Sequence, residues 1–492
     1  MIMNISFRDI GYITVTFLVL LGFAIYHPDG SFAMNPTYWA DEAVSVEKAR
    51  SLLTYGTLDI AVAPGVLSDK PYATAAAGPL LTVPLAGFFS VFGISVTGVR
   101  VFMMIVLGIL TVSVYFFARS LYGQGVGFAA TLLFVTFSPL YANGKTATGD
   151  IPGFLALLFG LWVLFKKRWY VFSGILLGVA ITTKPSLYLP VAGIAVLEIF
   201  LSEHTKERII HALRLMGGSL IVCLPWLYSL IPDMKNPASW KETYFFFRNP
   251  FPDDAVSVIY QLMQGNISAL VHTTIFHFFI LFIVAGTVYI FTRHLDEARY
   301  RFIRFAVLYS AVAFILYLRS PSWLRYLIAG ELLLFISFLP SLETIWHARA
   351  FRYWVPKWFP AFIVGFLIML QGIHMGFFAW RTASWTVPEK AQAITALLNP
   401  GDTIGVIDDI SVASLINSRQ KFQIVRISGN TILGKNPLAY SSNELPTYIY
   451  IPRSRFGNMA VRDFVDPYKD ILETYYKSIP VPEERYMLYK RL

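Results

Sequence analysis

Two adjacent acidic residues, Asp41 and Glu42, stand just after Tyr38 and Trp39 in a segment that follows the first apolar run of the chain. Aromatic residues of these types favour membrane–water interfaces. A carboxylate within hydrogen-bond reach of a hydroxyl group can act as a general base. Capping is the alternative interpretation, because Asp41 could cap a helix that continues at helical spacing as far as Leu53.

A lysine in the motif Ser68-Asp69-Lys70-Pro71-Tyr72 precedes a further apolar stretch. A phosphate at headgroup depth needs a charged or dipolar partner, and Lys70 suits a lipid phosphate in this place. The alternative is a lysine whose aliphatic stem lies along apolar surface while its ammonium group reaches water.

Further charges stand in later connections between apolar runs. Asp150 begins one run, where it suits either helix capping or a site. Lys184 precedes a proline, and Arg319 and Arg325 flank the sequence Ser-Pro-Ser-Trp-Leu. Glu331 lies deeper in the next run, and a charge inside a membrane span is by default a functional candidate because its burial is costly.

Membrane-spanning helices are the elements that must position these residues. Of the 492 residues, 56% are hydrophobic and 14% are charged, whereas a soluble domain is about one quarter charged. About 20 helical residues cross a hydrocarbon core of roughly 30 Å. The runs are apolar on every face, which excludes the alternation of a β-barrel. The eleven runs cover about 10–26, 98–118, 125–141, 151–165, 169–184, 186–201, 211–231, 271–292, 302–318, 325–343 and 357–380.

A twelfth apolar stretch, 79–94, is interrupted by Pro84, Gly87 and Gly93 and could span or lie at the interface. Cytoplasmic connections carry an excess of Lys and Arg. If the stretch does not span and the N-terminus is cytoplasmic, the basic clusters face inward; if it spans, they face outward. The sequence therefore predicts eleven spans, with 79–94 re-entrant or interfacial. The inner clusters are then Arg119; Lys166, Lys167 and Arg168; Lys206, Arg208 and Arg214; Arg293, Arg299, Arg301 and Arg304; and Arg349, Arg352 and Lys357.

This topology predicts a multi-pass protein of the plasma (inner) membrane, with a transmembrane domain over 1–383. Two large outer loops, 27–97 and 232–270, and a soluble domain over 384–492 are expected on the extracytoplasmic side. Strand-like and helix-like segments alternate in the C-terminal domain, which predicts a small α/β fold with a supporting or acceptor-binding role. The expected helices are 388–398, 411–417 and 464–475, and the expected strands are 402–407, 422–427, 448–451 and 486–492.

Composition also limits the chemistry. The net charge of +10 is interpreted as topology-setting loop charge and not as a nucleic-acid surface. Cys223 is the single cysteine, so no internal disulfide forms. Any cofactor is expected to be a divalent metal, with His272 and His277 at the start of a span as its candidate ligands; a structural role for these histidines is the alternative.

The segment 38–150 resembles the GT-C superfamily of integral membrane glycosyltransferases. The resemblance rests on Asp41-Glu42-Ala43, Lys70-Pro71, Phe92-Gly93, Arg100 and Asp150, together with the large first outer loop. The protein-mannosyltransferase-like branch, which includes aminoarabinose-to-lipid-A transferases, is the most similar. The family often has a second proline where this chain has Tyr72, which bears on the shape of that loop.

The resemblance implies an inverting transfer of a monosaccharide from a polyprenyl-phosphate-linked donor to a lipid, glycan or protein acceptor. Asp41 is then the general base, and Glu42 orients the acceptor or helps to hold a metal. Asp150 positions hydroxyl groups of the acceptor or sugar. Lys70 and Arg325 bind the donor phosphate, and Lys184 and Arg319 are further phosphate-binding candidates.

Two other classes of protein are compatible with the sequence. A lipid or sugar transporter or flippase would show charged or broken helices near the midplane and repeated halves. Here most charges lie at the ends of spans, and no repeat is evident. A membrane-anchored assembly protein would have the C-terminal domain as its working part and would tolerate changes in 38–72.

Overall fold

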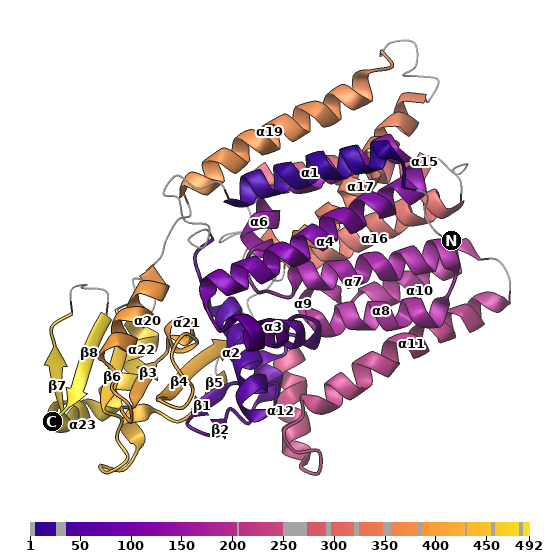
Figure 1. Ribbon diagram of the computed structural model, residues 1–492. Coiled ribbons are helices and arrows are strands. Elements are labelled where there is room, and N and C mark those ends of the chain that lie inside the picture. The colour runs from indigo at the N-terminus through magenta and orange to yellow at the C-terminus, as the bar shows by residue number, and fades with distance from the viewer. Residues whose placement is uncertain are drawn as a thin grey trace. The chain divides into compact units, whose positions relative to one another are not determined.

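The computed structural model describes residues 5–25, 36–203, 206–248, 273–291, 297–318, 324–347, 356–381, 386–428, 431–453, 458–481 and 486–492. Contacts divide the chain into two compact units (Figure 1). The membrane unit consists of Met1–Pro36, Arg100–Trp226 and Val256–Ala383. The loop–sheet unit consists of Thr37–Val99, Leu227–Ala255 and Ser384–Leu492. The expected division into 1–383 and 384–492 stays a prediction.

Each of the eleven apolar runs coincides with helix in the residues that the structure describes, which confirms the helical interpretation of these runs. The helices are α1 (Phe7–Ile25), α4 (Val96–Tyr122), α5 (Gln124–Val135), α6 (Ser138–Gly144), α7 (Asp150–Trp162), α8 (Tyr170–Thr183), α9 (Pro185–Tyr188), α10 (Val191–Ser202), α11 (Glu207–Ser229), α15 (Thr273–Phe291), α16 (Glu297–Leu318), α17 (Ile328–His347) and α19 (Phe359–Arg381), with a π-helical turn η2 (Val163–Lys167) and a 3-10 turn η5 (Leu324–Leu327).

Seven described helices are long and apolar enough to cross a membrane, or eight if α5 and α6 form one span bent by 65°. The chain is therefore a polytopic, mainly helical membrane protein. The number of eleven spans stays a prediction, since α8 and the described part of α15 are shorter apolar helices. The interrupted stretch forms α3 (Pro79–Phe92), whose 14 residues extend only about 21 Å, less than the roughly 30 Å of a hydrocarbon core.

Helices α8 and α11 approach closely because glycines leave room for the partner backbone. A Cβ atom added at Gly174 would lie 2.0 Å from the carbonyl oxygen of Leu215, and one added at Gly218 would lie 2.1 Å from that of Val171. The Ser219 hydroxyl donates a hydrogen bond of 3.0 Å to the Gly174 carbonyl. Small residues allow this packing in membranes, where apolar burial provides little drive for association.

Charged side chains are also buried between helices of the membrane unit. Arg301 Nη2 lies 2.9 Å from Glu198 Oε2, and Arg304 pairs with the other oxygen of the same carboxylate. All three side chains are at most 8% exposed. Buried charges of this kind have to be paired, because an isolated one would lose its hydration without compensation. The cluster therefore joins α10 to α16.

The loop–sheet unit contains a six-stranded sheet in the order β5-β4-β3-β6-β8-β7 (Figure 1). The central strand β3 pairs in parallel with β4 and β6, while the outer pairs are antiparallel. The strands are β3 (Ile404–Ile407), β4 (Lys421–Ser428), β5 (Thr431–Leu433), β6 (Tyr448–Pro452), β7 (Tyr476–Ile479) and β8 (Tyr486–Arg491).

Both faces of this sheet are covered, and alternate residues of a strand therefore enter different cores. Tyr448 and Tyr450 pack in a cluster with α20 (Thr386–Leu397) and α21 (Ile410–Ala413). Ile449 and Ile451 pack in a second cluster with α22 (Asn458–Val465) and α23 (Lys469–Tyr475). The expected α/β organisation of the C-terminal region is confirmed, although β5 and β7 were not predicted.

The rest of the loop–sheet unit comes from two other segments of the chain. Helix α2 (Ala40–Tyr55) ends at Gly56, whose φ of 72° is accessible to glycine at little cost. A two-stranded ribbon of β1 (Ala61–Ala63) and β2 (Val66–Leu67) follows, and then the 3-10 turn η1 (Pro71–Thr74) and α3. Helix α12 (Pro237–Arg248) belongs to the same unit.

The glycine contact between α8 and α11 generates a matched test. Gly218→Val should lower the stability of the detergent-solubilised protein by about 1–3 kcal/mol, because its side chain would overlap the α8 backbone. Gly217→Val is the control, since a Cβ atom there meets nothing within 4 Å. Equal thermal unfolding midpoints for the two variants would contradict the close packing.

Candidate functional site

Asp41 and Glu42 lie in the first turn of α2, but neither caps it. The helix is preceded by Trp39 at the cap position, and no side chain makes a cap hydrogen bond. The predicted N-cap role of Asp41 is therefore wrong. Asp41 is partly exposed, while Glu42 is completely buried. Acidic residues in the first turn are stabilised by the helix dipole, which favours negative charge at this end.

Helix α2 is an unusual core helix because most of its buried side chains are polar. Nine of its 16 residues are buried, and only Ala43, Val46 and Ala49 among them are apolar. A helix normally docks through an apolar stripe. The position of α2 therefore depends on polar contacts, and the C-terminal sheet provides several of them.

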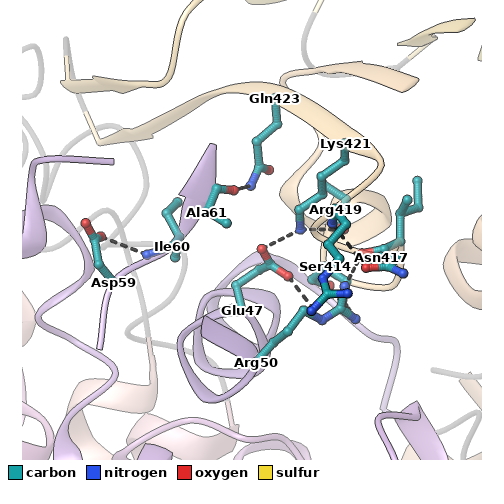
Figure 2. A network of polar contacts seen from close by, with 12 residues as sticks. Glu47, Arg50, Asp59, Ile60, Ala61, Ser414, Asn417, Arg419, Lys421 and Gln423 are labelled. Carbon is teal, nitrogen blue, oxygen red and sulfur yellow. Dashed lines mark hydrogen bonds and ion pairs between the residues drawn. The ribbon is translucent and has the colours of Figure 1, made fainter. Parts of the chain in front are cut away.

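The first contact is an ion pair between Glu47 of α2 and Lys421 of β4, shown in Figure 2. Both side chains are completely buried. Lys421 also donates a hydrogen bond of 2.9 Å to the carbonyl of Ala413, at the end of α21. Burial lowers the pKa of Lys421 to about 8, while the Glu47 carboxylate opposes this shift. Removing one partner of such a pair costs about 3–5 kcal/mol, because the other charge is left uncompensated.

Arg50 makes the second contact, one helical turn along α2 (Figure 2). Its guanidinium donates to the carbonyl oxygen of Ser414, at 2.6 Å, and to that of Ile416. The hydroxyls of Tyr38 and Ser414 are 2.7 Å apart. These partners are about 360 to 380 positions apart in the sequence, so only the fold could reveal them.

The ribbon after α2 is attached to the same sheet. Gln423 of β4 donates a hydrogen bond of 2.5 Å to the Ala61 carbonyl of β1 (Figure 2). Beneath the ribbon, Asp59 accepts a hydrogen bond of 2.5 Å from the Ser68 hydroxyl. Burial raises the pKa of Asp59, and hydrogen bonds from Ser68 and the Ile60 amide counteract that rise.

Lys70 immediately precedes η1 and is part of this assembly. Its ammonium nitrogen lies 3.4 Å from the carbonyl oxygen of Ile432 in β5. The next residue but one, Tyr72, packs against α12: its ring lies 5.4 Å from that of Phe246, and its hydroxyl is near enough to the Glu242 carboxylate to be affected by its charge. Burial, together with the Glu242 carboxylate, raises the pKa of Tyr72 to about 12.

Asp150 is the first residue of α7 in the membrane unit and is only 1% exposed. Neither of its carboxylate oxygens has a hydrogen-bond partner among the described residues. The helix shows no side-chain cap, so the predicted capping role does not hold. A buried carboxylate without hydrogen bonds is costly and calls for a functional explanation.

The segment 183–188 packs directly against the start of α7. A Cβ atom added at Gly149 would lie 2.4 Å from the Thr183 carbonyl oxygen and 3.2 Å from the Lys184 Cβ atom. The Tyr188 hydroxyl donates a hydrogen bond of 2.5 Å to the Asp150 carbonyl. The structure thus brings the segment of Lys184 next to the start of α7.

Arg100 and Lys145 use their charge to fix backbone in the membrane unit. Arg100 is buried and donates hydrogen bonds of 2.8 Å each to the carbonyl oxygens of Lys145 and Pro36. Lys145 donates one of 2.9 Å to the Ala24 carbonyl at the end of α1. The two residues therefore hold the segment that leads from α6 to Asp150 against other parts of the membrane unit.

The remaining candidates are divided between described and undescribed residues. Arg325 lies in η5, whereas Arg319 and His272 lie outside the described residues. His277 Nδ1 is 3.7 Å from Glu331 Oε1, and its other ring nitrogen is 3.4 Å from the Gln371 amide nitrogen. Glu331 is therefore paired inside the membrane unit. The sequence had singled out both residues without predicting this contact.

A metal site is not assembled from the described residues. No group of three or more His, Cys, Asp or Glu side chains comes together in that part of the chain. The pair His277–Glu331 offers two ligands, one fewer than a catalytic zinc site usually has.

The two acids of α2 and Lys70 belong to the loop–sheet unit, while Asp150, Lys184 and Arg325 belong to the membrane unit. Within each unit the candidates are anchored by the contacts described above. Their convergence on one outer site stays a prediction.

Comparisons with known proteins define the class. A family model described as dolichyl-phosphate-mannose-protein mannosyltransferase matches residues 70–228. No curated protein matches the sequence significantly. The solved structure of ArnT from Cupriavidus metallidurans bound to undecaprenyl phosphate is similar, with a TM-score of 0.62 and 13% identity over 99% of this chain and 98% of that one.

The oligosaccharyltransferase of Archaeoglobus fulgidus, in complex with zinc and sulfate, is also similar: its TM-score is 0.56 and its identity 12%, over 98% of this chain and 73% of that one. At such identities the likeness shows the fold. The fold is therefore that of the ArnT structure, and the family match over 70–228 agrees with the resemblance to the GT-C superfamily. The family match and the shared fold together support a membrane glycosyltransferase.

The buried lysine of α2 generates a pH prediction. Lys48 is 4% exposed and donates a hydrogen bond of 3.1 Å to the Thr74 carbonyl; burial lowers its pKa to about 8. Between this value and the unfolded value near 10.5, the unfolded chain binds more protons than the folded protein. The contribution of Lys48 to stability therefore rises with pH in this window, by at most about 1.4 kcal/mol per pH unit.

Thermal unfolding of the wild type and of Lys48→Met, measured at pH 7.5 and pH 9.5, checks this expectation. The stability of the wild type relative to the variant should increase at the higher pH. Lys477→Met, at an exposed position of β7, should show no such change. A difference that stays constant or shrinks as the pH rises would contradict the lowered pKa of Lys48.

Proposed function

We propose that the chain is an inverting glycosyltransferase that moves a monosaccharide from a polyprenyl-phosphate-linked donor to a lipid, glycan or protein acceptor. The match of the mannosyltransferase family model to 70–228, which contains both Lys70 and Asp150, carries this proposal. A protein of the same fold has been solved with undecaprenyl phosphate, and another with dolichol-phosphate and an inhibitory peptide. The donor is expected in the same chemical class.

In the proposed reaction, an acceptor oxygen attacks the anomeric carbon of the donor sugar. The new bond between that oxygen and the anomeric carbon forms as the bond from the carbon to the phosphate oxygen breaks. Asp41 takes the proton from the acceptor, and polyprenyl phosphate leaves. Inversion follows because attack and departure occur on opposite faces of the carbon.

Each remaining side chain has a role in this scheme. Glu42 orients the acceptor, and Lys70 and Arg325, with Lys184 and Arg319, stabilise the charge that develops on the leaving phosphate. Asp150 accepts hydrogen bonds from hydroxyl groups of the sugar or acceptor. Its two buried oxygens lack such partners within the described residues, which is what a binding role requires.

The charge distribution of the loops supports an outer location for this site. With the basic connections on the cytoplasmic side, 27–97, 232–270 and the C-terminal region face outward. The protein is then a component of the plasma (inner) membrane that acts at its extracytoplasmic face. A transporter or flippase is the second class, and it is less favoured because the family match is to a transferase.

The base assignment is tested by replacing Asp41. Asp41→Asn should reduce sugar transfer by about 10²–10⁴-fold, the usual contribution of proton transfer to a positioned carboxylate. Release of undecaprenyl phosphate from a panel of undecaprenyl-phosphate sugars, with envelope lipids as acceptors, measures the rate. Asp470→Asn, on exposed α23, should transfer normally. Normal transfer by a folded Asp41→Asn protein would exclude Asp41 as the base.

The assignment of Lys70 and Arg325 to the donor phosphate is tested by measuring donor binding. Lys70→Ala and Arg325→Ala should each weaken donor binding by about 10–100-fold, as expected for the loss of a charge-assisted hydrogen bond worth roughly 1.5–3 kcal/mol. Titration with undecaprenyl phosphate measures the affinity. Lys469→Ala, at an exposed lysine of α23, should bind like the wild type. The assignment fails if both variants keep the wild-type affinity.

A further inference from the structure

We propose that Lys421 and Arg50 are positioning residues for the transfer reaction: they clamp α2 to the C-terminal sheet and so set where Asp41 and Glu42 stand. The inference rests on the proposed role of Asp41 as the base. It gives residues 384–492 a part in the reaction, although the family match ends at 228 and includes neither α2 nor this sheet.

The clamp is attached to the most constrained part of the loop–sheet unit. Lys421 is the first residue of β4, and β4 is the parallel neighbour of the central strand β3. Its ammonium group holds both Glu47 and the Ala413 carbonyl, which ties α2 and α21 to the same strand. Arg50 reaches the carbonyl oxygens that follow α21. The contacts of Glu47 and Arg50, which are three positions apart, therefore fix one face of α2.

The two contacts control the orientation of the helix. Glu47 follows Asp41 by six positions, which is about 9 Å along the helix axis. A tilt of about 10° at the clamp would move Asp41 by roughly 1.5 Å. Displacements of about 1 Å at a reacting group can cost on the order of 10²-fold in rate. A small change in the direction of α2 is therefore expected to lower the rate.

The charged groups of Glu47, Lys421 and Arg50 are suited to fixing the orientation of α2. Apolar contacts are non-directional, and a buried ion pair can often be replaced by well-packed neutral residues without loss of stability. Hydrogen bonds from Lys421 and Arg50 have preferred angles and end on defined oxygens. Since only three of the nine buried residues of α2 are apolar, the charged contacts are directional restraints on the helix.

The test uses the full-length protein in detergent and the same panel of undecaprenyl-phosphate sugars. The double variant Glu47→Gln/Lys421→Met removes both charges while nearly keeping both volumes. Arg50→Met is a second variant, which removes the contacts of Arg50 with the Ser414 and Ile416 carbonyls and with Glu47, and it stays informative if the double variant does not accumulate. Lys477→Met is the matched control, because this exposed lysine lies on β7, the edge strand beyond β8.

We expect kcat to fall about tenfold or more in the double variant and in Arg50→Met, with the donor KM within about twofold of the wild type. The control should match the wild type in both constants. A wild-type kcat in a folded double variant, or a loss carried entirely by KM, would overturn the positioning role. A kcat loss of equal size in Lys477→Met would overturn it as well.

The outcome separates this inference from the proposed function. If Asp41→Asn is inactive while both clamp variants keep the wild-type kcat, the base assignment stands and the clamp does not position it. If the wild type releases no undecaprenyl phosphate from any donor, the proposed function fails, and the positioning role fails with it.

Discussion

The ion pair between Glu47 and Lys421 is the interaction on which the loop–sheet unit depends. Two complete charges are removed from water: Glu47 is compensated by Lys421 and by Arg50, whose Nε lies 3.7 Å from Glu47 Oε1, and Lys421 also donates to the Ala413 carbonyl. The partners are 374 positions apart, so the pair joins segments that are distant in the sequence. The segment Thr37–Val99 and the C-terminal sheet belong to one compact unit.

The membrane unit is held together by other kinds of contact than the loop–sheet unit. Its helices satisfy their own backbone hydrogen bonds, and close approach is obtained from glycines such as Gly174 and Gly218. Its buried charges, Glu198, Arg301 and Arg304, are paired with one another. Asp150 stands apart because no described group donates to its carboxylate oxygens. A side chain kept at this cost is better explained by a substrate than by the fold.

Local sequence patterns predicted the elements well, and long-range chemistry was beyond them. Apolar runs gave the helices of the membrane unit, and alternating strand and helix signals gave the sheet domain. The predicted caps at Asp41 and Asp150 were wrong because a polar residue before an apolar run looks the same whether it caps the helix or points elsewhere. The partners Ser414, Ile416 and Lys421 were missed, since no short-range periodicity connects them to α2.

The residue after Lys70-Pro71 shows how tertiary contacts can replace a local restraint. A second proline would fix the backbone φ angle in that loop by its ring, but this chain has Tyr72. Its ring packs 5.4 Å from that of Phe246, so α12 contacts the turn. Two contacts therefore hold the region of Lys70. Its ammonium group contacts β5, and Tyr72, two residues further along, contacts α12. The loop around Lys70 is thus held by packing, and tyrosine in place of the second proline does not require a looser loop.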